Sequence, residues 1–142
     1  MNDALVLCSA LPERRLAAGE VLIQEGVRSN ALYVLQSGAL DVIRDGVRVV
    51  GIDEPGAFLG EISVLLGAPP TATVVASRMT VVHVIENAAT VIRTQPGLTY
   101  LVARLLARRL NAATARLVEI KREQADASAR VELLEKLLAD LE

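Results

Sequence analysis

The chain has 142 residues, a length typical of one domain and sufficient to bury a single core. Its formal net charge is −2 and it has only three aromatic residues, so it lacks the basic stripe and stacking platform of a nucleic-acid-binding protein. No apolar run approaches the roughly 20 residues that cross a bilayer, and no signal peptide is recognisable at the start. The single cysteine, Cys8, cannot form an internal disulfide. We therefore expect a cytoplasmic protein that does not contact membranes, with Cys8 as an ordinary core or surface thiol.

The inventory of catalytic side chains is small. The one histidine, His83, lies in an alternating apolar stretch and is predicted to be a structural strand residue. No group of cysteines and histidines has the spacing of a metal site, and neither Ser37 nor Ser63 has a nearby base to activate it. We expect no catalytic residues, no metal and no enzymatic activity.

The first half of the chain carries short alternating or apolar runs separated by turn residues, which predicts β-strands. The predicted strands are Glu20–Gln24, Ala31–Gln36, Ala39–Arg44, Val47–Val50, Thr71–Ala76 and Thr80–Ile85. Between two of them, Asp45 and Gly46 form a strong hairpin signal, because glycine accepts a positive φ. Several short strands at close spacing favour a barrel or jelly roll.

The second half of the chain changes to a helical period. A short helix is predicted from Glu86 to Gln95, and one long helix from Leu98 to Glu142, a stretch without proline or glycine. We therefore predict a mainly β domain in residues 1–96, followed by a long C-terminal helix in residues 97–142.

Apolar residues follow the long helix in alternating steps of four and three, which is the heptad seam of a coiled coil. After Leu106, the seam residues are Leu110, Ala113, Leu117, Ile120, Gln124, Ala127, Val131, Leu134, Leu138 and Leu141. With Leu110 at heptad position a, Gln124 is the one polar a residue, and a buried polar pair there can fix register. The seam predicts a homodimer through this helix. Near Leu98–Leu110 the stripe is wider, which favours packing on the chain's own β-domain.

The orientation of the paired helices stays open. In a parallel pair, Arg130 at position g can reach Glu135 at position e of the partner, whereas the pair of Arg116 and Lys121 is like-charged.

The segment from Gly56 to Val74 contains the most informative motif, with Gly60, Glu61, Pro69, Thr71 and Ala72 in a characteristic order. It resembles the phosphate-binding cassette of cyclic-nucleotide-binding domains, which occur in the catabolite activator protein, in regulatory subunits of protein kinase A and in gated channels. The resemblance extends over about residues 10–120, through Gly19–Gly26, Leu32–Gly38 and Ala107–Thr114. It implies a β-roll sensor fold and a cyclic AMP or cyclic GMP ligand, with no other cofactor.

The resemblance also implies site residues. These are the cassette residues Gly60, Glu61, Ile62, Ser63, Pro70, Thr71 and Ala72, together with Arg109 and Thr114 on the long helix. By resemblance, Glu61 accepts a hydrogen bond from the ribose hydroxyl and Thr71 donates to the cyclic phosphate. Arg109 lies near the sugar and Thr114 faces the purine. Simpler roles remain open: Glu61 as a helix-start residue, Thr71 as the first residue of a strand, and Arg109 and Thr114 as solvated helix residues.

The glycine and short helix of the cassette also favour anion binding independently, through free backbone N–H groups. One departure weakens this expectation. Members of the family that bind nucleotide carry an arginine after the cassette proline, and this chain has Pro70, which offers no donor. Helix-end amides and Thr71 would remain, and Arg28 or Arg78 could substitute from a neighbouring loop.

Three binding functions therefore stay open. The chain is a cyclic-nucleotide sensor that acts through its long helix, or a dimerising protein-interaction module whose degenerate cassette binds no cyclic nucleotide, or a module for another anion or nucleotide. Transcription factors of this family continue into a helix-turn-helix. Because the heptad pattern still runs at Glu142, we expect no direct nucleic-acid binding.

Overall fold

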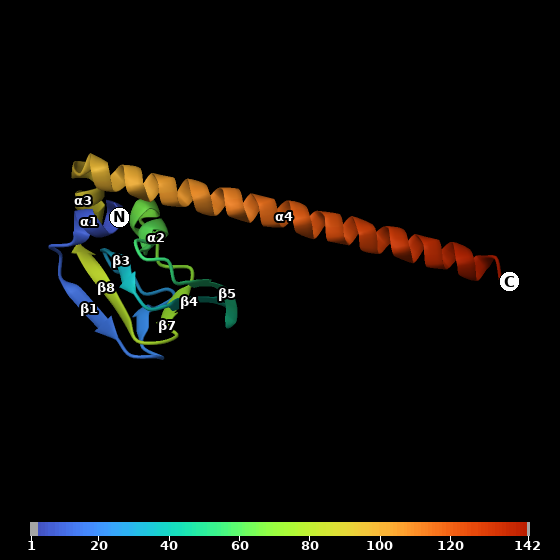
Figure 1. The fold of residues 1–142 in the computed structure, drawn as a ribbon, viewed down its shortest axis with the longest axis horizontal. Coiled ribbons are helices and arrows are strands. Elements are labelled where there is room, and N and C mark those ends of the chain that lie inside the picture. Colours follow the sequence, from blue (N-terminus) through green and yellow to red (C-terminus); the bar gives the residue numbers. More distant parts are fainter. Residues whose placement is uncertain (1–2, 142) are drawn as a thin grey trace. The chain divides into compact units, whose positions relative to one another are not determined.

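A computed structural model describes residues 3–141 (Figure 1), and the outer limits of the two predicted domains, Met1 and Glu142, lie outside that range. The described chain forms eight strands and four helices. The strands are β1 (Glu13–Leu16), β2 (Val21–Ile23), β3 (Ala31–Ser37), β4 (Leu40–Arg44), β5 (Val47–Ile52), β6 (Phe58–Leu59), β7 (Thr73–Ala76) and β8 (Thr80–Glu86). The helices are α1 (Asp3–Cys8), α2 (Glu61–Leu66), α3 (Ala88–Thr94) and α4 (Pro96–Ala139).

The strands form two four-stranded antiparallel sheets, with the orders β1-β8-β3-β6 and β2-β7-β4-β5. Large apolar side chains from both sheets meet in one core, which includes Leu16, Leu35, Leu40, Leu59 and Val82. The two sheets and the long C-terminal helix confirm the predicted β-roll fold (Figure 1).

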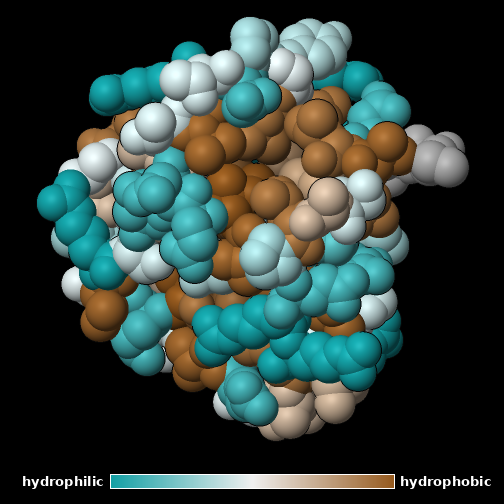
Figure 2. Space-filling view, turned by 90° about the vertical axis from the view of Figure 1, so that its left-hand side faces the viewer, coloured by the Kyte–Doolittle hydropathy of each residue, from teal (hydrophilic) through white to brown (hydrophobic). Residues whose placement is uncertain are grey.

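The central strand β3 shows why this half of the chain folds as it does. Its first five residues are all buried, since alternate side chains point to opposite faces of the sheet and both faces are covered. One face contributes Tyr33 and Leu35 to the core between the sheets, and α1, α2 and α3 also contact β3. In Figure 2, apolar residues gather in the upper part of the viewed face, and hydrophilic residues cover much of its lower part.

The Asp45-Gly46 hairpin is confirmed. Both residues have a positive φ, 51° and 76°, and they connect β4 to β5. This combination is the two-residue turn whose twist matches that of the flanking strands.

Some element boundaries were wrong. The strand predicted from Thr71 begins at Thr73, because Thr71 and Ala72 form a bend after two prolines. The helix predicted from Leu98 begins at Pro96, since proline is tolerated in the first turn of a helix. That helix ends at Ala139.

The structure divides into two compact units, one ending at Leu105 and the other beginning at Leu106. The division falls further along the chain than the predicted domain boundary after residue 96. Leu98 and Val102 explain this, because they are buried although they belong to α4.

Cys8 ends α1 and is 1% exposed, so it is a core thiol. Burial raises the pKa of the Cys8 thiol above its ordinary value. Since the folded pKa is the higher one, the thiol's contribution to stability is complete below the unfolded pKa and is lost as pH rises through the folded pKa. We expect Ellman's reagent at pH 8 to modify Cys8 at least ~100-fold faster in denaturant than in the native protein. Equal rates would contradict the burial of this thiol.

Candidate ligand site and pairing face

The segment with the cassette motif connects β6 to β7 and contains α2. Gly60 caps the start of α2, and Gly67 caps its end in the left-handed conformation, with its N–H donating to the Ser63 carbonyl. The Ser63 hydroxyl also donates to the Ala68 carbonyl. Two backbone turns and one side chain therefore hold the segment in a compact shape.

Gly60 lies at a position that strongly favours glycine. Its φ is 90°, and an added Cβ would lie 3.0 Å from the Ala31 carbonyl oxygen and 3.6 Å from Ile23 Cδ1. A side chain here would meet both backbone strain and the wall of β3. The glycine thus sets the start of α2 directly against the sheet.

Glu61 follows as the first residue of α2 and is only 3% exposed. Buried carboxylates are uncommon unless they are paired or have a role in binding. A negative charge in the first turn of a helix is also favourable, so the structural role that the sequence left open fits this position as well. Ile62, the next residue, is exposed.

Two threonines at the far end of the cassette, Thr71 and Thr73, have different surroundings. Thr71 is exposed, and no hydrogen-bond partner for its hydroxyl is found among residues 3–141. Thr73 accepts hydrogen bonds from the Glu25 amide (3.1 Å) and the Gln24 side chain (3.3 Å), so it ties the start of β7 to the loop after β2. Of these two threonines, Thr73 therefore has a structural hydrogen-bonding role, and the proposed contact of Thr71 with a ligand stays a prediction.

Pro70 is half-buried, and its carbonyl accepts a hydrogen bond from the Gly26 amide at 2.8 Å. That bond ties the loop after β2 to the cassette. Ala72 is also half-buried. The loop after β2 also brings Arg28 close to the end of α2. A Cβ added at Gly67 would lie 3.7 Å from Arg28 Nη2.

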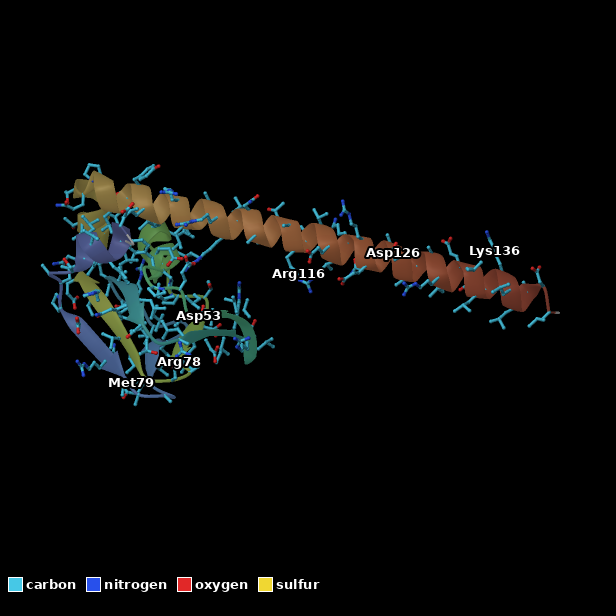
Figure 3. The ribbon with its side chains drawn as sticks, in the orientation of Figure 1. Asp53, Arg78, Met79, Arg116, Asp126 and Lys136 are labelled. Carbon is cyan, nitrogen blue, oxygen red and sulfur yellow. The ribbon has the colours of Figure 1, made fainter. Side chains whose placement is uncertain are left out.

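The two arginines proposed as substitutes for the missing one differ in position. Arg78 lies in the turn between β7 and β8, and its Nη2 donates a hydrogen bond to the Gly38 carbonyl at 3.3 Å. Figure 3 places Arg78 and Met79 at the end of the roll away from α2. Of the two, only Arg28 lies beside the cassette.

Arg109 and Thr114 lie on α4 within the second unit. Their predicted approach to the sugar and purine stays a prediction.

The seam residues of α4 are solvent-exposed in the single chain, and α4 buries only Leu98 and Val102. Leu110 is 70% exposed and Leu134 is 58% exposed. A helix with such a row of exposed leucines has an unpartnered apolar face. This face fits the predicted pairing, although the pairing itself stays a prediction.

Three further observations concern metal binding, membrane spans and His83. Among residues 3–141, no three His, Cys, Asp or Glu side chains are grouped closely enough to hold a metal ion. Within the same range, no helix combines the length and apolarity needed to span a membrane. His83 is buried on β8, with Nδ1 3.3 Å from the Leu11 carbonyl oxygen, in keeping with a structural strand residue.

Curated relatives match about half of the chain. The chain is 39% identical over 84 residues to a cAMP-dependent protein kinase regulatory subunit from Blastocladiella emersonii, a match that covers 56% of this chain and 21% of that protein. It is 38% identical over 74 residues to the acetyltransferase Pat from Mycolicibacterium smegmatis, which covers 50% of this chain and 22% of the acetyltransferase. The chain thus matches only about a fifth of the length of these relatives.

Solved structures share the fold. The catabolite activator protein of Thermus thermophilus superposes with a TM-score of 0.66 at 26% identity, over 85% of this chain and 60% of that one. A cyclic nucleotide-binding domain from Methylobacillus flagellatus superposes with a TM-score of 0.69 at 24% identity, over 80% and 69% of the two chains. The family model of the cyclic nucleotide-binding domain matches residues 13–91. Those residues contain every strand of the roll and the whole cassette, and the chain belongs to the cyclic nucleotide-binding domain family.

Proposed function

We propose that this chain is a regulatory domain that binds cyclic AMP or cyclic GMP at its cassette and responds through α4, which pairs with a second copy. The observation that carries the ligand part is the arrangement around Gly60. A left-handed backbone that favours glycine precedes the buried Glu61 at the start of α2, and the exposed Thr71 belongs to the same cassette.

In the proposed complex, groups of the cassette and of the loop after β2 hold the ligand. Glu61 accepts a hydrogen bond from the ribose 2′-hydroxyl, and Thr71 donates to the cyclic phosphate. The α2 amides and the positive charge of Arg28 add attraction for the anion. The ligand acts as a switch only if it favours one arrangement of α4 over another.

The role of Thr71 can be tested by replacing its hydroxyl with a methyl group of similar shape. Hydrogen bonds to charged groups contribute about 1.5–3 kcal/mol, so Thr71→Val should weaken cyclic AMP binding ~10- to 100-fold in a fluorescent-nucleotide competition assay. Thr90→Val, an exposed threonine on α3, is the matched control and should bind like the unchanged chain. Equal affinity of both variants would remove Thr71 from the site.

A second role is favoured by Pro70, which lacks the charged fork that grips a cyclic phosphate. In this role the roll binds no cyclic nucleotide, and the chain serves as a dimerising protein-interaction module or binds a different ligand.

A further inference from the structure

Basic and acidic side chains are unevenly distributed along the chain. Residues 87–118, which cover α3 and the first half of α4, contain no Asp, Glu or Lys, and they carry the five arginines Arg93, Arg104, Arg108, Arg109 and Arg116. The other residues hold all 17 acidic side chains and only ten of the 15 basic ones. A positive segment in a chain of negative net charge is a signal for an anionic partner.

Arg104 and Arg108 carry this signal most clearly. They lie four residues apart on α4, so their side chains are neighbours on the surface of the helix. Both are exposed, and among residues 3–141 neither has an ion-pair partner. Like charges at this spacing destabilise a helix. A local cost without a structural gain is typical of a surface that serves binding.

The arginines further along α4 have acidic neighbours. Arg116 Nη1 lies 2.9 Å from Glu119 Oε2, and Arg122 and Arg130 are each four residues from Asp126. Opposite charges at such spacings attract one another, and they account for these residues as an ordinary solvated face. That account does not extend to the earlier pair, because no acidic residue lies three or four positions from either of those two arginines.

Tyr100 adds an aromatic ring one turn before Arg104. The tyrosine is 63% exposed, and the centroid of its ring is 5.9 Å from Arg104 Cζ. This cation–π contact holds the guanidinium in place, so less side-chain freedom is lost when its N–H groups bind an acceptor. Tyr100, Arg104 and Arg108 together form an exposed surface, which we call the arginine face of α4.

The chemistry of the arginine face fits carboxylates. A guanidinium presents parallel N–H donors that bind a carboxylate through two hydrogen bonds, which the ammonium group of lysine does not do. The acid-free segment has arginine at every basic position. Tyrosine and arginine are also the residues that contribute most to binding where proteins meet. The face therefore fits a short acidic segment of a protein.

Nucleic acids and membranes fit this face less well. Duplex DNA carries about one charge per 1.7 Å along its whole length, and a duplex laid along α4 would also meet Glu119, Glu123 and Asp126. A helix that lies on a membrane has large apolar residues next to its basic ones. The positions that continue the arginine face hold Asn111 and Ala115.

We propose that the arginine face of α4 binds an acidic segment of another protein. Arg104 and Arg108 each pair with a carboxylate of that segment, and Tyr100 packs against its apolar atoms. The proposal goes beyond the proposed function, since it rests neither on the cyclic nucleotide nor on the pairing of two copies.

An acidic peptide tests this face in the full chain. Fluorescein-labelled octaglutamate should bind with a Kd of about 100 μM or tighter in about 50 mM salt, measured by fluorescence anisotropy, and raising the salt should weaken it. Arg104→Gln and Arg108→Gln should each weaken binding at least ~3-fold, and the double variant at least ~10-fold. Arg122→Gln, at the same outward heptad position as Arg108, is the matched control and should change the Kd less than about twofold.

Arg108→Glu separates binding from folding. It replaces a like-charge pair on the helix with an opposite-charge pair, so the melting temperature should not fall, while the peptide should bind at least ~10-fold more weakly. A lower melting temperature would show that Arg108 serves folding and would overturn the proposal.

Three further results would overturn it as well. These are a failure of the peptide to bind, equal binding by the unchanged chain and the double variant, and binding at least ~10-fold tighter to a thymidine oligonucleotide of about 20 residues or to phosphatidylserine vesicles than to the peptide.

Discussion

Replacing Pro70 with arginine is expected to tighten the binding of cyclic AMP roughly 10- to 100-fold, because a bidentate charged grip on the phosphate contributes about 1.5–3 kcal/mol per hydrogen bond. The backbone allows the change, since the hydrogen bond at this position uses the Pro70 carbonyl, which arginine keeps. Loss of a proline costs less than about 1 kcal/mol of stability through the unfolded chain. Titration calorimetry of the two proteins measures the difference.

Two controls separate geometry from charge. Pro69→Arg adds the same charge one residue earlier, at an exposed position, and should leave the affinity within about twofold of the unchanged chain. Pro70→Lys adds charge without the planar fork and should give a smaller gain than Pro70→Arg. If Pro70→Arg fails to improve binding, the cassette does not hold a phosphate in the geometry of the family.

Leu134→Glu is expected to raise the dimer Kd at least ~100-fold, because it removes a large apolar side chain from the seam of both copies and adds two charges there. Glutamate is a good helix former, so α4 itself should persist. Sedimentation equilibrium measures the association, and circular dichroism checks that helix content is unchanged.

Leu133→Glu is the matched control, since Leu133 is an equally exposed leucine one residue away and outside the seam. It should leave the Kd within about twofold. Equal loss of association in both variants would contradict a heptad interface, and no loss in either would mean that copies do not pair through this face.

Most of the roll follows from local patterns in the sequence. The apolar runs of β3 and β8 identify strands by composition, and the Asp45-Gly46 turn identifies a hairpin by φ preference. Three elements could not be found this way. Of the four residues of β1, Glu13, Arg14 and Arg15 are exposed and only Leu16 is buried, so β1 forms because β8 offers a partner edge. The two-residue β6 and the N-terminal α1 are too short for any periodic signal.

The candidate site could also be predicted only in part from the sequence. Motif order identified Gly60, Glu61 and Thr71, and a glycine before a short helix is a physical signal for the turn that the structure contains. The position of Arg28 beside Gly67 depends on the pairing of β2 with β7 and on the Gly26 hydrogen bond to Pro70. Because those contacts are far apart in sequence, the sequence alone could not choose between Arg28 and Arg78.

The most direct test of the proposed function is a calorimetric titration of the unchanged chain with cyclic AMP and with cyclic GMP. We expect saturable binding of at least one of them, with a Kd of about micromolar or tighter and one site per chain. Thermal stability should also rise with ligand concentration, as for any ligand that binds only the folded state. The absence of both heat and thermal shift would contradict a cyclic-nucleotide sensor and leave a paired protein-interaction module, or a module for another ligand, as the function of the chain.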